Sequence, residues 1–292
     1  MISKFLIGGV VAGVLFSGSV SAQKTEVAPA EQGNKYLQFN YEKLGVKERK
    51  AIPFPSLREA DAVYAKRIQR VIDVREKKNL PLKWPKNPLW KVLRDNIMAG
   101  EGKGYGKLKS YTYDSIATPY TIDEIKARGG HSMTVTIQPD PINNPDYTID
   151  RDTVEAFDWS KITRYIISEE WIFDKQRSQF FPRIIAFAPL FKQTVNGVEL
   201  AEQTLCWINY AEFRKVAINE EIFNRTNDAM RLTYNDFFED RLFSSYITKE
   251  SNEFDAAIRE LPEFKDDPMG ALYESERIKD NLFNWEHDLW EY

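Results

Sequence analysis

The sequence predicts an α+β fold, in which an antiparallel β-meander of about three to five strands packs with flanking helices and a C-terminal amphipathic helix. Three observations predict this class. Strand-like apolar stretches occupy the centre of the chain, the pair Asn196-Gly197 separates two of them, and both ends show apolar residues at three- and four-residue spacing.

Residues 1–22 have the pattern of a secretory signal peptide. Lys4 supplies the positive charge, an apolar stretch covers 5–14, and small residues precede a predicted cleavage site between Ala22 and Gln23. An uncleaved anchor helix is the less favoured alternative, because the apolar stretch is short and interrupted by Gly and Ser. No cysteine lies near this site, so no lipoprotein anchor is expected there.

Residues 23–57 lack apolar periodicity and combine a basic patch with Pro53 and Pro55. We interpret this range as an extended or disordered arm, which is either a linker without a role or an arm that orders on a neighbour. Residues 58–292 are then a single domain with a substantial core. The chain has a single cysteine, Cys206, so no internal disulfide is expected. Its apolar surroundings favour a buried thiol over pairing between chains.

The first predicted helix follows Ser56 and ends near Asn79, because the prolines beyond it cannot continue a helix. Its apolar residues at three- and four-residue spacing are Ala60, Tyr64, Ile68, Val71 and Ile72. A second helix is predicted over 89–98. The glycine-rich stretch 100–106 comes after this helix and before strand-like 108–113, so we interpret it as a mobile loop rather than a phosphate-binding loop.

Thr121 and Glu124 form a capping box, which predicts a short helix that ends near Gly129. Residues 133–138 alternate like a strand, and 139–152 read as a loop rich in Pro, Asn and Asp.

The meander is predicted from strands over 162–173, 181–191 and 200–210. A two-residue turn at Asn196-Gly197 would place Phe187 opposite Cys206 and Ala186 opposite Trp207. Both faces of this hairpin are apolar, so we expect it in the middle of the sheet.

Beyond Ala211 the pattern becomes helical. A short helix is predicted over 220–223, and Thr233 is predicted to cap another. The last helix is predicted over 275–290, with Trp285 and Trp290 on different faces, one in the core and one available to a partner. The candidate interface comprises Trp285, His287, Asp288, Trp290 and Tyr292.

No catalytic, cofactor-binding or metal-binding residues are predicted. The net charge of −4 argues against nucleic acid as the main partner, and the two histidines do not converge on a metal. The carboxylate pair Glu169-Glu170 is the best candidate for chemistry, since one of the two could point inward with a raised pKa. We favour a structural interpretation, in which one faces solvent and the other pairs with an arginine such as Arg164 or Arg183.

Several segments resemble the GldN/PorN family of gliding and type IX secretion proteins. They are RIQRVIDVREKKNLPL at 67–82, EEWIFDKQRS at 169–178, RIIAFAPL at 183–190, LCWINY at 205–210, FNRTND at 223–228, SSYITKESN at 244–252, SERIK at 275–279 and EHDLWEY at 286–292. These segments follow the family's order. Cys206 departs from the expected aromatic residue, and 23–55 has no match.

The resemblance implies a structural subunit of the periplasmic GldK–GldN-type ring of the type IX secretion system, without catalytic activity. The expected partners are a GldK/PorK-type outer-membrane lipoprotein, copies of the chain itself and the GldL–GldM motor. Periplasmic location at the outer membrane would come through the lipoprotein, without a membrane span. The alternative is a periplasmic hydrolase or ligand-binding protein that uses a carboxylate cleft.

Overall fold

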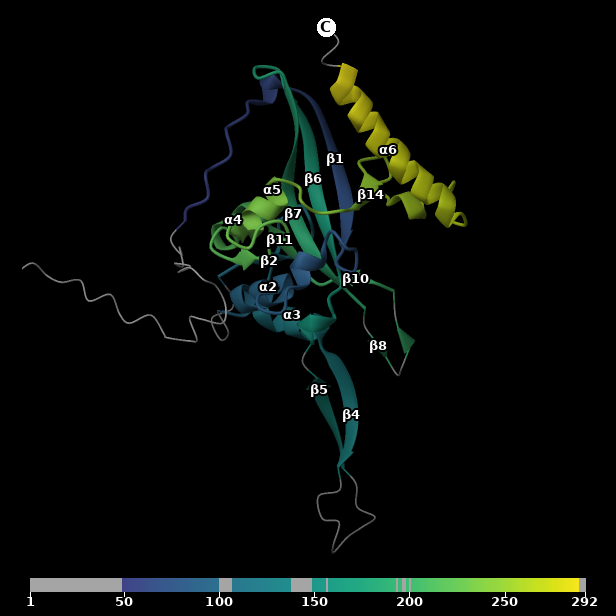
Figure 1. Cartoon of the computed structure of the whole chain (residues 1–292). Coiled ribbons are helices and arrows are strands. Elements are labelled where there is room, and N and C mark those ends of the chain that lie inside the picture. Colours follow the sequence, from purple (N-terminus) through teal and green to yellow (C-terminus); the bar gives the residue numbers. More distant parts are fainter. Residues whose placement is uncertain are drawn as a thin grey trace, which may run out of the picture. The chain divides into compact units, whose positions relative to one another are not determined.

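The computed structural model describes residues 49–99, 107–137, 149–155, 157–192, 194–195, 198–199 and 201–288 (Figure 1). All of them belong to the compact unit Val46–Tyr292. The predicted signal peptide with Ala22 and Gln23, the arm up to residue 48 and the glycine-rich loop lie outside the described residues.

The described part contains an eight-stranded antiparallel sheet in the order β14-β1-β6-β7-β11-β2-β3, with β10 paired to β7. Its strands are β1 (Ala62–Asp73), β2 (Ser110–Tyr111), β3 (Pro119–Tyr120), β6 (Arg164–Asp174), β7 (Gln179–Phe191), β10 (Gln203–Thr204), β11 (Trp207–Asn209) and β14 (Tyr246–Glu250). The α+β class is confirmed. The predicted number of strands is wrong, because a first strand and several two- to five-residue strands join the meander.

The predicted helix after Ser56 is the largest error, since this segment forms β1 between β6 and β14 (Figure 1). Tyr64, Ile68 and Ile72 are four residues apart, and a spacing of four fits a strand period of two as well as a helical turn. Arg70 lies on the same face and is buried, so a charged residue in the core concealed the alternation.

The centre of the meander is confirmed by the eleven-residue strand β6 and the thirteen-residue strand β7, which pair from Asp174–Gln179 to Arg164–Leu190. The hairpin signal is confirmed too, because β8 (Thr194–Val195) pairs with β9 (Val198–Glu199) around residues 196–197. These backbone pairs have the predicted register.

The register predicted further from this turn is wrong. Phe187 faces Ile208 rather than Cys206, and Ala186 faces Asn209 rather than Trp207. One extra residue enters the returning strand before β10 and another before β11, as two successive bulges would insert them. A shift of two residues keeps each side chain on its predicted face, so the apolar pattern could not report it.

The described helices are α2 (Leu89–Met98), α3 (Ile122–Gly129), α4 (Tyr210–Ala217), α5 (Tyr234–Glu239) and α6 (Pro268–Asp288), with 3₁₀ turns η1 (Glu59–Asp61), η2 (Leu80–Lys83), η3 (Trp159–Lys161) and η4 (Ile258–Glu260). The predicted capping box at Thr121 and the predicted cap at Thr233 are present, and Thr233 forms a capping box with Asp236. α6 begins seven residues before the predicted start, where Pro268 suits a first helical position and Asp267 accepts hydrogen bonds from two backbone N–H groups.

Two short predictions need correction. The predicted helix over 220–223 is wrong, since Glu221–Ile222 forms the strand β12, which pairs with β13 (Leu232–Thr233). Four residues are too few to distinguish a helical period from a strand period. The predicted strand over 133–138 is confirmed as β4 (His131–Ile137), but its partner β5 (Ile149–Glu155) occupies the end of the predicted loop 139–152.

The main core lies where α2, α4 and α5 cover the sheet, around fully buried Phe187, Tyr210 and Phe213. Cys206 belongs to this core, and burial raises the pKa of its thiol to about 12. The expectation of a buried thiol is therefore confirmed. A smaller core around Ile68 holds α6 against the sheet, mainly at its edge strand β14.

Gly129, the last residue of α3, has no room for a side chain. A Cβ atom there would lie 2.8 Å from the side chain of Phe157 and 3.3 Å from Cδ1 of Leu205, which is buried. We expect Gly129→Ala to lower the free energy of unfolding by about 1–3 kcal/mol, measured by urea denaturation. An unchanged midpoint would show that Phe157 moves aside at no cost.

Candidate interaction surface

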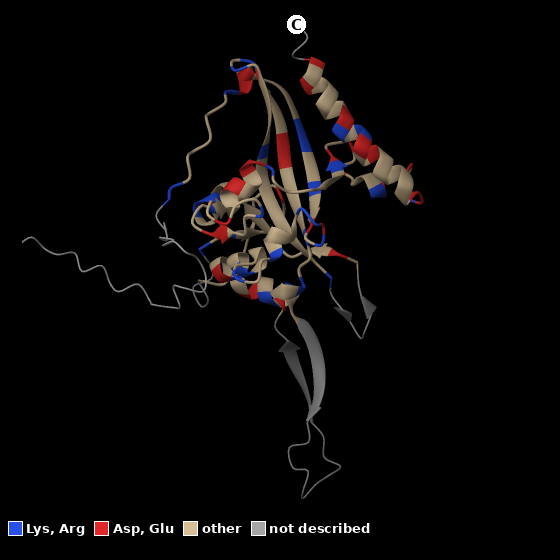
Figure 2. Ribbon diagram, viewed as in Figure 1, with Lys and Arg blue, Asp and Glu red and all other residues tan. Residues whose placement is uncertain are grey.

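The carboxylate of Glu169 on β6 is fully buried and surrounded by donors. Its Oε1 accepts from Nε of Arg70 on β1 and, at 2.9 Å, from Nε1 of Trp171. Arg241, just after α5, donates to Oε2 at 2.8 Å and to Oε1 at 3.3 Å. Figure 2 shows the acidic residues of β6 beside basic residues of β1.

These contacts make Glu169 part of a structural ion network. Burial alone would raise the pKa of its carboxyl group, but the positive charges of Arg70 and Arg241 and the hydrogen bonds that they and Trp171 donate hold the pKa below its usual range. An acid held ionised, with both oxygens occupied, is poorly suited to exchange protons with a substrate.

The predictions for this carboxylate pair are thus partly confirmed. Glu169 points inward and pairs with arginines, as we favoured, but its pKa is lowered rather than raised. Its partners are Arg70 and Arg241, not Arg164 or Arg183. Arg164 pairs instead with Glu202 at 2.6 Å. Glu170 is half-buried on the opposite side of the strand.

The C-terminal helix α6 buries one side against the sheet and exposes apolar residues on the other. Its buried residues are Ala271, Ser275, Ile278 and Leu282. Its exposed apolar residues, here called the outer stripe, are Met269, Leu272, Tyr273 and Phe283. At 100° per residue the outer stripe lies a quarter turn or more from the centre of the buried side, on a side of the helix that also exposes Glu276, Lys279 and Asp280.

Trp285 belongs to the buried side of α6. Its ring stacks on Tyr64 with centroids 4.3 Å apart and contacts Phe173 and Phe180 at 5.6 and 5.1 Å. Tyr64, Phe173 and Phe180 are direct neighbours across β1, β6 and β7, so the indole covers one face of three strands. Trp285 is therefore better placed as a packing residue than as a contact for a partner.

The other candidate interface residues divide into two groups. His287 and Asp288, the last described residues of α6, are exposed. Trp290 and Tyr292 lie outside the described residues, so the prediction that Trp285 and Trp290 occupy different faces stays a prediction. The outer stripe was not predicted, because 268–274 was not assigned to the helix.

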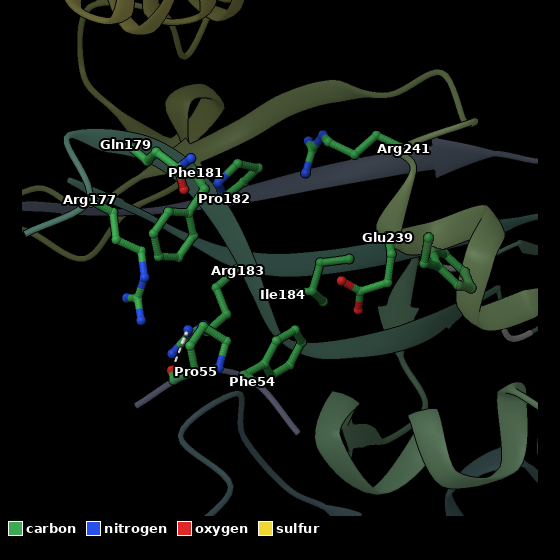
Figure 3. Close-up of a pocket in the computed structure, with 11 residues that line it drawn as sticks. Phe54, Pro55, Arg177, Gln179, Phe181, Pro182, Arg183, Ile184, Glu239 and Arg241 are labelled. Carbon is green, nitrogen blue, oxygen red and sulfur yellow. Dashed lines mark hydrogen bonds between the residues drawn. The ribbon is translucent and has the colours of Figure 1, made fainter. Parts of the chain in front are cut away.

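A pocket of about 360 Å³ lies between β7, the end of α5 and the extended residues 49–57 (Figure 3). Its lining includes Phe54, Phe181, Arg177, Arg183 and Arg241. The guanidinium of Arg183 donates to the backbone oxygen of Pro55 at 3.2 Å, as the dashed line in Figure 3 marks.

The pocket also positions the last residues of the predicted arm. The ring of Phe54 contacts the guanidinium carbon of Arg214 at 3.9 Å and that of Arg183 at 5.0 Å. Five residues earlier in the chain, the backbone N–H of Arg49 donates to the side-chain oxygen of Asn219 at 3.0 Å. Residues 49–57 therefore lie against the domain, whereas the boundary of the arm itself stays a prediction.

Within the described residues, no group of three or more His, Cys, Asp or Glu side chains is arranged to hold a metal ion. None of the helices described combines the length and apolar character needed to cross a bilayer.

A family model described as "Gliding motility associated protein GldN" matches residues 57–291 of the chain. No curated protein matches the sequence significantly. The matched range covers every described element of the fold and ends before the final residue of the candidate interface.

Proposed function

The chain belongs to the GldN family of gliding-motility-associated proteins, and from this premise we propose that it is a structural subunit of the periplasmic GldK–GldN-type ring of the type IX secretion system. In this role it supports protein export across the outer membrane and gliding. A GldK/PorK-type lipoprotein would hold it at the outer membrane, and the GldL–GldM motor would act on the assembled ring.

The observation that carries the proposal is the outer stripe of α6. Leu272, Tyr273 and Phe283 are 46, 63 and 65% exposed, although the opposite side of the same helix is packed. Exposed aromatic and large apolar residues interspersed with charged ones on one side of a helix suit a surface that another protein covers. The carboxylate that a hydrolase would use, Glu169, is instead occupied by its arginine and indole partners, so we propose no second function.

The proposal predicts the behaviour of the chain in envelope fractions. The wild-type chain is expected to co-purify with copies of itself and with the lipoprotein. Leu272→Asp with Tyr273→Asp should abolish this association without shifting the melting temperature, because both side chains are exposed. Deletion of the gene should stop secretion of several cargo proteins at once.

A matched control places the same charge elsewhere. Phe254 is 75% exposed and lies outside α6, so Phe254→Asp should leave co-purification unchanged. A wild-type chain that is strictly monomeric and never accompanies the lipoprotein would contradict the ring role. Equal loss in Phe254→Asp would mean that the effect is not specific to α6.

A further inference from the structure

The first half of β7 is an open sheet edge. β6 pairs with one side of the strand along its whole length, but on the other side β11 pairs only with residues 186–187 and β10 only with 190–191. No other described strand pairs with residues 179–185. Pro182 lies in this stretch and has no N–H to donate, but the other unpaired backbone groups on the edge are a template for an added strand.

The same edge borders the pocket, which contributes charge and aromatic surface. Three guanidinium groups and one carboxylate, Glu239, line it. Arg177 pairs with Asp174, Arg241 shares Glu169 with Arg70, and Glu239 pairs with Arg214. Among the described residues Arg183 takes part in no ion pair, and it lies over the ring of Phe181 at 5.5 Å. This guanidinium, which donates to the backbone oxygen of Pro55 but has no carboxylate partner among the described residues, thus lies beside the open edge.

The pocket therefore suits an extended segment that carries carboxylates and aromatic rings. The sequence of this chain has this composition at 286–292, Glu-His-Asp-Leu-Trp-Glu-Tyr, with three acidic and two aromatic residues among seven. In this structure residues 286–288 form the last turn of α6, so this turn must unwind before the segment can extend. The seven residues then span about 23 Å, comparable to the open edge of 179–185. The last four lie outside the described residues.

We propose that residues 286–292 of a second copy add to the open edge of β7, with a carboxylate at Arg183 and an aromatic ring against Phe54 and Phe181. The inference rests on the proposed ring, because joining a tail to a different surface of the next copy is a head-to-tail contact, and such contacts close into rings by rotation.

A labelled peptide of residues 283–292, titrated with the purified full chain and followed by fluorescence anisotropy, tests the contact. Arg183→Glu should weaken peptide binding by about tenfold or more. A peptide in which Glu286, Asp288 and Glu291 are replaced by Lys should bind Arg183→Glu better than it binds the wild type. Arg259→Glu makes the same charge change at an exposed site on η4 and should bind like the wild type.

Arg183→Ala is measured beside Arg183→Glu, and melting curves establish that each variant is folded. Equal affinity of the wild type and both Arg183 variants for the peptide would overturn the proposal. A wild-type protein that does not bind the peptide at millimolar concentration would overturn it too. A peptide that binds only after Trp290→Ala and Tyr292→Ala are introduced into the full-length protein would show that each tail occupies the pocket of its own chain. That result would also overturn the proposal. The peptide titration contains no lipoprotein, so a negative result there rejects the tail contact alone. Failure of envelope co-purification would instead reject the proposed ring role.

Discussion

Glu169→Gln is expected to lower the free energy of unfolding by about 3–5 kcal/mol. The substitution keeps the shape of the side chain but leaves Arg70 and Arg241 without the charge that compensates their burial. Arg70 is only 7% exposed, and burial together with the nearby Arg241 already lowers the pKa of its guanidinium. Urea denaturation, with the midpoint and slope compared to those of the wild type, measures the effect.

The neighbouring Glu170 supplies the control. It is half-buried and takes part in no ion pair within the described residues, so Glu170→Gln should change stability by about 0.5 kcal/mol or less. The same two variants test the hydrolase alternative. That alternative requires that Glu169→Gln or Glu170→Gln loses hydrolytic activity while the protein still folds. Equal stability of the two variants would mean that the arginines find other partners.

The contribution of Glu169 should also depend on pH. Because its folded pKa is lower than its unfolded one, its stabilising effect is complete above the ordinary carboxyl pKa of about 4.3 and is lost as the pH falls through the lower folded value. The stability difference between the wild type and Glu169→Gln should therefore be constant near neutral pH and shrink in acid. A difference that grows in acid would contradict the lowered pKa.

Truncation after Asp280 should have an effect at least as large, about 5 kcal/mol or more. The cut removes Leu282, which is 4% exposed, together with Trp285 and its contacts to three aromatic rings. The smaller core around Ile68 would lose the end of its covering helix. Thermal unfolding followed by circular dichroism measures the loss, and envelope co-purification should fail as well.

Two single substitutions separate stability from assembly. Trp285→Ala should cost about 3 kcal/mol, because a large ring leaves a cavity between α6 and the sheet. Phe283→Ala, on the outer stripe of the same helix, should cost about 0.5 kcal/mol or less and still weaken association. A truncated chain that melts and assembles like the wild type would show that the end of α6 is dispensable.

Local signals were sufficient for part of this fold. The helix caps at Thr121 and Thr233 and the turn at residues 196–197 depend on residues a few positions apart, and each was predicted. β1 was missed because its four-residue apolar spacing is shared by helices and strands, and because the charge of Arg70 is tolerated only through pairing with a strand far along the chain.

The candidate surfaces show the same limit. Glu169 stood out in the sequence, but its partners Arg70 and Arg241 are 99 and 72 residues away, so neither could be identified from spacing. The pocket combines residues near 54, 180 and 240, and no single segment carries its pattern. The outer stripe of α6 depended on finding the true start of the helix at Pro268.

The buried thiol of Cys206 is a natural probe for local opening of the core, because its chemical modification requires exposure to solvent. A thiol is modified as thiolate, and one with a pKa near 12 inside the core reacts only when the meander separates. The rate at which a maleimide or disulfide reagent consumes Cys206 would therefore follow transient exposure of the strand edge next to β7. In the proposed ring this reaction should be slower, and no engineered probe is needed to observe it.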